Sequence, residues 1–154
     1  MASPRVHVLN GPNLNLLGVR EPDIYGRQTL RDVEQLCQEV ADRHGLELVF
    51  RQTNAEYQMI DWLQEARLDA GVAINPAAFT YHSVPVLDAI KMLECPVIEV
   101  HISNIHRREA EWRSKSILTV AVTGMITGLG IHGYALALEH LAQLIKQSSI
   151  KHAT

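Results

Sequence analysis

Two polar segments near the start of the chain contain residue types that recognise an oxygen-rich small molecule. The apolar run 5–9 ends in a turn that contains Asn10 and Asn13, and the next loop carries Arg20 and Tyr25. Amides and a guanidinium bind hydroxyl and carboxylate oxygens, and a phenol beside a cation suits a reaction in which the phenol ionises. Taken singly, such residues are most often turn formers or surface groups, so their common position in the fold matters.

A glutamate and a histidine two residues apart form a second chemical motif. Glu99 and His101 stand at the end of the apolar run 96–101. In a strand, residues i and i+2 point to the same side, so the carboxylate can lie beside the imidazole and orient it. Such a pair suits a general acid, and a buried pair without a catalytic role is the alternative. His101 and His106 have no third ligand at a suitable spacing, so we expect no metal site.

Alternating apolar runs and helical patterns predict the elements that position these residues. Expected strands are 5–9, 47–52, 71–75, 96–101 and 117–122; expected helices are 30–44, 56–66, 84–93 and 134–147. Strands that alternate with helices predict an α/β fold with a doubly wound parallel sheet. The length fits a single domain over residues 1–154, with residues 148–154 as a flexible tail.

Polar residues follow three of these strands. Asn75 ends the run 71–75, Glu99 and His101 end the run 96–101, and Asn10 and Asn13 follow the first run. Because parallel strands end at one edge of a sheet, where open α/β proteins bind ligands, these side chains are expected to converge. The convergence indicates a small-molecule site more strongly than any single residue does.

Composition and missing motifs exclude several function classes. The net charge of −3 provides no basic field for nucleic acid, and no apolar run has membrane-spanning length. The phosphate-loop and nucleophile-elbow patterns do not occur, and the glycines of 124–133 do not follow the first strand as a dinucleotide motif requires. We therefore expect no cofactor. Cys37 and Cys95 fit free thiols in a reducing cytoplasm.

Five motifs, in order along nearly the whole chain, resemble type II 3-dehydroquinate dehydratase. They are Asn10-Gly-Pro-Asn-Leu-Asn, Arg20-Glu-Pro-x-x-Tyr25-Gly, Ile74-Asn-Pro, Ile98-Glu-Val-His-Ile-Ser-Asn and Gly128-Leu-Gly-x-x-Gly-Tyr134. The resemblance implies a flavodoxin-like fold with a five-stranded sheet. It also implies cofactor-free dehydration of 3-dehydroquinate to 3-dehydroshikimate, by a dodecamer built as a tetramer of trimers.

The resemblance also implies catalytic roles. Tyr25 matches the base that removes a proton from carbon 2, next to the ketone, and Arg20 matches the cation that favours tyrosinate. With an ordinary pKa near 10, only about one tyrosine in a thousand is ionised at neutral pH. Asn13 matches the group that steadies the enolate. His101, oriented by Glu99, matches the acid that protonates the departing hydroxyl.

Substrate-binding roles follow from the same resemblance. Asn75 would position the departing hydroxyl, while Ile102 and Ser103 would hold the substrate carboxylate. Arg113 matches the arginine that reaches the ring hydroxyls, and Asp88 matches an acid contributed by a neighbouring subunit.

The chain departs from the family pattern around its third strand. Ala77-Ala78 stands where the family usually has Gly-Ala or Ala-Gly. In the following Thr-His-Thr-Ser motif, Tyr81 takes the slot of a substrate-contacting histidine and His82 comes one place later. Adjacent residues of an extended segment point opposite ways, so we expect His82 not to substitute without a backbone shift. These changes would alter substrate affinity more than reaction type.

Two alternatives remain open at this point. The segment 107–113 is one residue longer than is common, so either Arg108 or Arg113 would reach the ring hydroxyls. A small-ligand binding or signalling module on the same fold is the other reading of the function, since fold does not fix function. A lysine Schiff-base mechanism is disfavoured, because none of the four lysines falls at the carboxyl end of a predicted strand.

Overall fold

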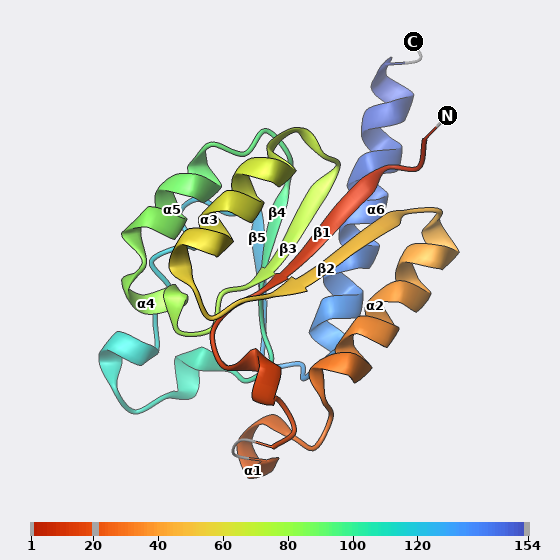
Figure 1. Cartoon of the computed structure of the whole chain (residues 1–154). Coiled ribbons are helices and arrows are strands. Elements are labelled where there is room, and N and C mark those ends of the chain that lie inside the picture. Colours follow the sequence, from red (N-terminus) through yellow and green to blue (C-terminus); the bar gives the residue numbers. More distant parts are fainter. Residues whose placement is uncertain (1, 20–21, 153–154) are drawn as a thin grey trace.

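Five parallel strands form one sheet in the order β2-β1-β3-β4-β5 (Figure 1). The computed structural model describes residues 2–19 and 22–152, with residues 24 and 25 described by their backbone alone. The strands are β1 Arg5–Asn10, β2 Glu47–Gln52, β3 Gly71–Asn75, β4 Val97–His101 and β5 Gly124–Thr127. This strand order is that of the flavodoxin-like doubly wound fold, so the predicted fold class is confirmed.

Helices cover both faces of the sheet (Figure 1). One face carries α2 Leu30–His44 and α6 His132–His152, and the other carries α3 Glu56–Glu65 and α5 Val84–Lys91. Two short helices lie in the loops after β1 and β3, namely α1 Pro22–Tyr25 and α4 Phe79–His82. Each face therefore has its own hydrophobic core.

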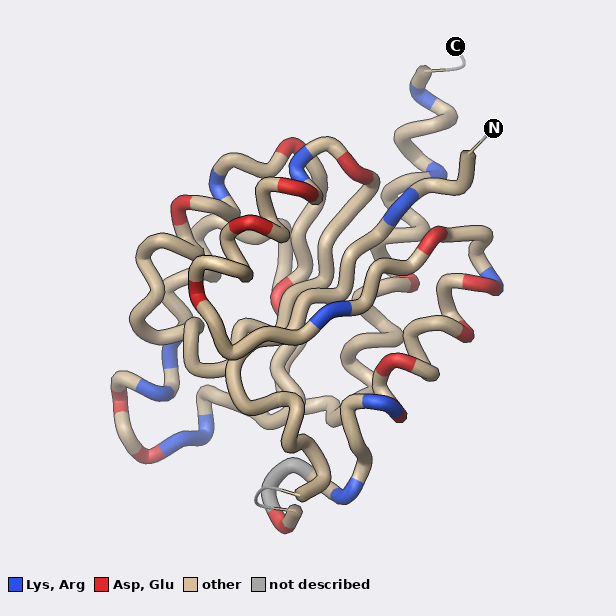
Figure 2. The backbone as a smooth tube through the Cα atoms, viewed as in Figure 1, with Lys and Arg blue, Asp and Glu red and all other residues tan. Residues whose placement is uncertain are grey.

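The alternation of β1 shows how the sequence builds the two cores. Val6 and Val8 are fully buried against α2 and α6, whereas Leu9 is fully buried against α3 and α5. Charged residues lie mainly on helices and loops (Figure 2). Within β3, β4 and β5, all of whose residues are described, Glu99 is the one Asp, Glu, Lys or Arg. A buried charge in this position needs partners, because desolvation is costly.

The first long helix begins and ends where the sequence predicts. The backbone N–H of Asp32 donates to Thr29 Oγ1 at 3.3 Å, and the N–H of Thr29 donates to Asp32 Oδ2 at 2.8 Å. This reciprocal capping box satisfies donors that the first helical turn leaves unpaired. Gly45 follows α2 with a φ of 65°, which favours glycine.

The fifth strand lies later in the chain than predicted. The prediction of a strand over 117–122 is wrong: β5 is Gly124–Thr127, and it pairs with β4 so that Glu99 lies opposite Met125. The apolar run before it forms turns and packs into the core under α3 and α5, where Leu118 is fully buried. Ile117, Ala121 and Val122 pack beside it as partly buried residues, whereas Val120 is exposed, so β-branched residues alone did not identify a strand.

The last helix extends further than predicted at both ends. α6 starts at His132 and continues through His152, so residues 148–152 are helical where a tail was predicted. No Gly or Pro occurs between residues 134 and 152, and Ser149 Oγ donates to the carbonyl of Ile145 at 3.0 Å. Among the described helices, none is long and apolar enough to cross a membrane.

Candidate active site

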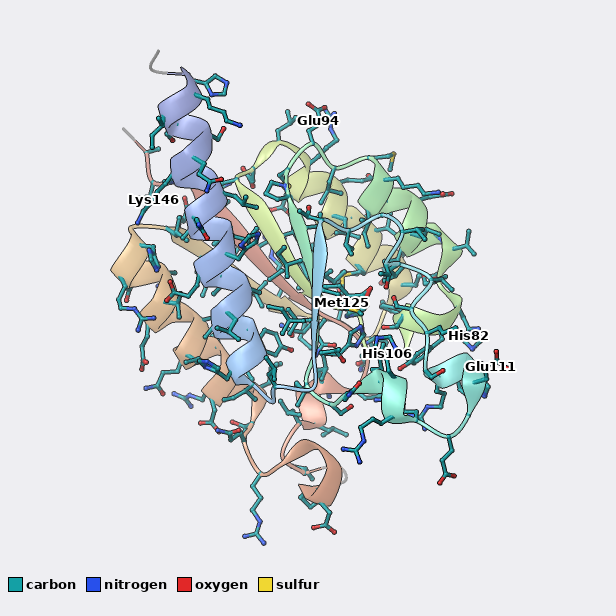
Figure 3. All side chains as sticks on the ribbon, turned by 180° about the vertical axis from the view of Figure 1, so that it is seen from behind. His82, Glu94, His106, Glu111, Met125 and Lys146 are labelled. Carbon is teal, nitrogen blue, oxygen red and sulfur yellow. The ribbon has the colours of Figure 1, made fainter. Side chains whose placement is uncertain are left out.

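A cavity of about 420 Å³ opens at the carboxyl ends of β1, β3 and β4. This is the point where the strand order reverses, which is where open α/β folds bind ligands. The end of the molecule that holds the cavity also carries His82, His106 and Glu111, opposite Glu94 (Figure 3). The lining residues come from the loops after the three strands: Pro12, Asn13, Leu14, Leu16 and Leu17; Asn75, Ala77, Ala78, Tyr81 and His82; His101, Ile102, Ser103, Arg108, Trp112 and Arg113.

The structure brings most of the predicted site residues together. Those that line the cavity are Asn13, Asn75, Tyr81, His82, His101, Ile102, Ser103 and Arg113. Glu99 lies behind His101 and contacts it. Asp88 is exposed on α5 and is not among the residues that line this cavity. Arg20 and the side chain of Tyr25 lie outside the described residues.

The Glu99–His101 pair is buried at the end of β4. His101 is 5% exposed and Glu99 is fully buried. Alternation along the strand places both on one side, where His101 Nε2 and Glu99 Oε2 are 3.1 Å apart. Because a carboxylate only accepts, the shared proton belongs on Nε2, which leaves Nδ1 for chemistry. The carboxylate thus fixes the tautomer and the orientation of the ring.

Two hydroxyl groups that the sequence did not identify hold the carboxylate in turn. Ser116 Oγ donates to Glu99 Oε1 at 2.6 Å, and Thr119 Oγ1 donates to Glu99 Oε2 at 3.4 Å. Ser116 Oγ also accepts from the backbone N–H of Leu118 at 3.1 Å, so it is anchored by its own loop. The sequence did not indicate this relation, because Ser116 and Thr119 stand in a loop and a turn whose course does not follow from periodicity.

The loop after β1 is held against the loop after β3. The N–H of Gly11 donates to the carbonyl of Asn75 at 2.8 Å, and a Cβ at Gly11 would lie 2.3 Å from the carbonyl oxygen of Pro76. Only glycine fits this close approach. Asn13 follows with a φ of 67°, and its N–H donates to Asn54 Oδ1 at 2.9 Å. Asparagine tolerates this left-handed conformation better than most residues.

A buried tyrosine that the sequence reading left without a role joins the two asparagines behind the cavity. The hydroxyl of Tyr134 donates to Asn10 Oδ1 at 2.7 Å and accepts from Asn75 Nδ2 at 2.8 Å. Tyr134 is fully buried at the start of α6, and this burial raises its pKa well above the usual value. Its phenol therefore stays neutral and serves as a hydrogen-bonding group rather than a base.

The outer wall of the cavity is aromatic and basic. Arg108 Nη1 donates to the hydroxyl of Tyr81 at 2.8 Å, and Nη2 donates to Ser103 Oγ at 3.1 Å. His82 stacks on Trp112, with ring centroids 5.4 Å apart. Tyr81 and His82 belong to the helical turn α4, so the expectation of an extended segment, on which the argument about His82 depended, is wrong. Both side chains line the cavity.

The charge of the described lining residues favours an anionic ligand. Arg108 and Arg113 both face the cavity, and no Asp or Glu is among the lining residues that the structure describes. Within the described part of the chain, no three His, Cys, Asp or Glu side chains are grouped so that they could hold a metal ion. The geometry thus combines an anion-binding wall with a buried acid–base pair.

Comparisons with known proteins agree on one family. The family model described as "Dehydroquinase class II" matches residues 4–142. The chain is 56% identical over 143 residues to "3-dehydroquinate dehydratase 2" of Agrobacterium fabrum, covering 92% of this chain and 97% of that protein. It is 57% identical over 140 residues to "3-dehydroquinate dehydratase" of Methylobacterium radiotolerans, covering 90% and 93%. The crystal structure of type II dehydroquinase from Propionibacterium acnes superposes with a TM-score of 0.88 at 46% identity, covering 92% and 97%.

Proposed function

Because this chain belongs to the class II dehydroquinase family, which makes it a hydro-lyase acting as a 3-dehydroquinate dehydratase, we propose that it works through an enolate with Tyr25 as base and His101 as general acid. The observation that carries this proposal is the buried Glu99–His101 pair beside an arginine-lined cavity. The substrate has a carboxylate, whose negative charge suits a cavity with two arginines in its lining, and a hydroxyl that must leave with a proton.

His101 would supply the proton of the second half of the reaction. After a proton leaves carbon 2, the ketone takes up the electron pair as an enolate. When the enolate collapses to the enone, the hydroxyl departs and takes a proton from Nδ1 of the His101 imidazolium, so that water forms. Glu99 accepts from Nε2 and stabilises the charged ring before the transfer.

Tyr25 would supply the base of the first half, and Arg20 would favour its ionised form. Each unit by which the tyrosine pKa falls requires about 1.4 kcal/mol of preferential stabilisation of the phenolate. A guanidinium nearby can provide this. Asn13, held in its turn by Asn54, would stabilise the enolate oxygen.

The cavity walls would bind the rest of the substrate. Ile102 and Ser103 would hold the carboxylate, and Asn75 would hold the departing hydroxyl. Arg108 already donates to Tyr81 and Ser103, so we assign the ring hydroxyls to Arg113.

We further propose that the protein assembles as a homo-oligomer in the cytoplasm and needs no cofactor. Asp88 is exposed on α5 and does not reach this cavity, which fits a role in a neighbour's site within a dodecamer built from four trimers. Cys37 and Cys95 are free, and burial raises the pKa of their thiols to about 12 and about 11, so both are unreactive. Unpaired thiols fit the cytoplasm. We propose that no cofactor takes part.

The proposal is tested by following enone absorbance when the protein meets 3-dehydroquinate. We expect turnover by the wild type after exhaustive chelation, near-complete loss in Tyr25→Phe, and wild-type rates in the control Tyr57→Phe, whose ring is 72% exposed on α3. If Tyr25→Phe kept more than about a tenth of kcat, a barrier change below roughly 1.4 kcal/mol, Tyr25 would not be the base. Binding without any enone would favour a ligand-binding module.

A further inference from the structure

A chain of hydrogen bonds runs behind the cavity between two backbone groups. Asn10 Nδ2 donates to the carbonyl of Arg51 at 3.1 Å, and the hydroxyl of Tyr134 donates to Asn10 Oδ1 at 2.7 Å. Asn75 Nδ2 donates to the Tyr134 oxygen at 2.8 Å, and the N–H of Ala77 donates to Asn75 Oδ1 at 3.2 Å. A backbone carbonyl can only accept and a backbone N–H can only donate, so both ends of the chain have a fixed direction.

This arrangement determines which way the Asn75 amide faces. In the reversed orientation, Nδ2 would meet the N–H of Ala77, which is a donor facing a donor. The oxygen of Asn75 would then meet the hydroxyl of Tyr134, whose single hydrogen is already given to Asn10. Reversal therefore loses two hydrogen bonds at a buried place, which is strongly unfavourable.

One hydrogen of Asn75 remains after these bonds are counted. The oxygen accepts from Ala77 and one N–H goes to Tyr134, so the second N–H is left for the cavity that Asn75 lines. We propose that Tyr134 is a positioning residue, which fixes Asn75 so that it presents an N–H donor, and not an acceptor, to the ligand. Tyr134 does not line the cavity itself, so it acts through Asn75.

The donor selects the kind of ligand atom that it meets. This step rests on the proposed function, in which that atom is the oxygen of the departing hydroxyl. The oxygen can accept from Asn75 with one lone pair and take the His101 proton with the other. An N–H aimed at this oxygen helps most when negative charge develops on it, so the contribution belongs to the transition state. Loss of the hydroxyl of Tyr134 should therefore lower kcat and leave KM nearly unchanged.

The test is a double-mutant cycle between Tyr134→Phe and Asn75→Ala, with kcat and KM measured for 3-dehydroquinate. We expect Tyr134→Phe to lower kcat about tenfold with KM within about twofold. In the Asn75→Ala background, Tyr134→Phe should change kcat less than twofold, because its target is gone. Asn75→Asp keeps the shape but offers no N–H, so it should lose at least as much kcat as Asn75→Ala.

Ile145→Val is the matched control, since it shortens a partly buried side chain of the same helix that takes no part in the chain of hydrogen bonds. It should keep wild-type kcat and KM. The proposal is overturned if Tyr134→Phe retains wild-type kcat, if the two kcat losses multiply in the double variant, or if Ile145→Val loses as much kcat as Tyr134→Phe. A wild type that forms no enone would refute the proposed function instead, and that result is seen before any variant is compared.

Discussion

The floor and the rim of the cavity are built differently. The floor consists of Asn75 and His101, which are 4% and 5% exposed and stand on the ends of adjacent strands. Each is held by a side chain that is itself fully buried, Tyr134 for Asn75 and Glu99 for His101. The pairing of β3 with β4 fixes the distance between these two residues, so their side chains have little freedom to move.

The rim consists of Tyr81, His82, Arg108, Trp112 and Arg113, which stand on α4 and on the segment after β4. Its contacts include ring stacking, arginines placed over aromatic rings and hydrogen bonds of one guanidinium, and Trp112 is 57% exposed. Proton transfer needs fixed donors, whereas binding an anion tolerates small shifts of a cation. The difference indicates that changes in the floor act on kcat and changes in the rim act on KM.

The largest effect on kcat is expected when His101, the general acid of the floor, is removed. His101→Ala should lower kcat by about 10² to 10⁴, the usual contribution of a positioned general acid, while KM changes little. His140→Ala, an exposed histidine of α6, is the control and should keep wild-type rates. Steady-state kinetics of both variants decide the point. A rise in KM with an unchanged kcat for His101→Ala would mean that the floor only binds.

The next effect concerns the support of the floor. Ser116→Ala removes the shortest of the hydrogen bonds on Glu99, and leaving a buried carboxylate short of a donor costs about 1–3 kcal/mol of stability. With Glu99 less firmly held, His101 is less well oriented, so we expect kcat to fall about tenfold with KM unchanged.

Ser114→Ala is the control for this prediction, because its hydroxyl donates only to the backbone carbonyl of Glu111 at 2.7 Å. Ser116→Thr should restore most of the activity. If Ser116→Ala kept the wild-type kcat while its melting temperature fell, Ser116 would serve the fold alone.

The floor was largely predictable from the sequence, because its residues follow strands of clear periodicity. β2 and β3 begin and end at the predicted residues, and the ends of β3 and β4 bring Asn75 and His101 to one edge. Tyr134 was not assigned a role, since an apolar helix face shows that a tyrosine is buried but not what its hydroxyl meets.

The rim and the support of Glu99 were less predictable, because both depend on loop conformation. The run 117–122 has the residue types of a strand, yet it forms turns, from which Leu118 and its partly buried neighbours pack into a core while Val120 is exposed. Ser116 and Thr119 were therefore missed. Tyr81 and His82 were expected on an extended segment, whereas α4 turns both into the cavity. The roles of Arg20 and Tyr25 stay predictions.

A moderate effect on KM is expected when the guanidinium of Arg108 in the rim is replaced. Arg108→Lys keeps the charge but cannot donate to Tyr81 and Ser103 from one planar group. KM should rise about tenfold, which corresponds to about 1.4 kcal/mol, while kcat stays within about threefold. Arg107→Lys changes an exposed arginine outside the cavity and should have no effect on either constant. A fall in kcat with constant KM for Arg108→Lys would place Arg108 with the floor.

The smallest effect is expected at Ala77, where the chain leaves the floor for the rim. Ala77 has a φ of 49°, a left-handed conformation that costs a residue with a Cβ about 1–2 kcal/mol and costs glycine little. Ala78 beside it has an ordinary φ of −65°. Ala77→Gly should therefore raise the free energy of unfolding by about 1 kcal/mol, and Ala78→Gly should lower it by about 0.5–1 kcal/mol. The melting temperatures, measured at one protein concentration, would move by about 2–4 °C in opposite directions.

Glycine keeps the N–H that Ala77 donates to Asn75, so kcat should remain within about twofold in Ala77→Gly. Equal destabilisation by both glycines would show that residue 77 is unstrained, and a large loss of kcat would show that the floor depends on the rigidity of this turn as well as on its hydrogen bonds.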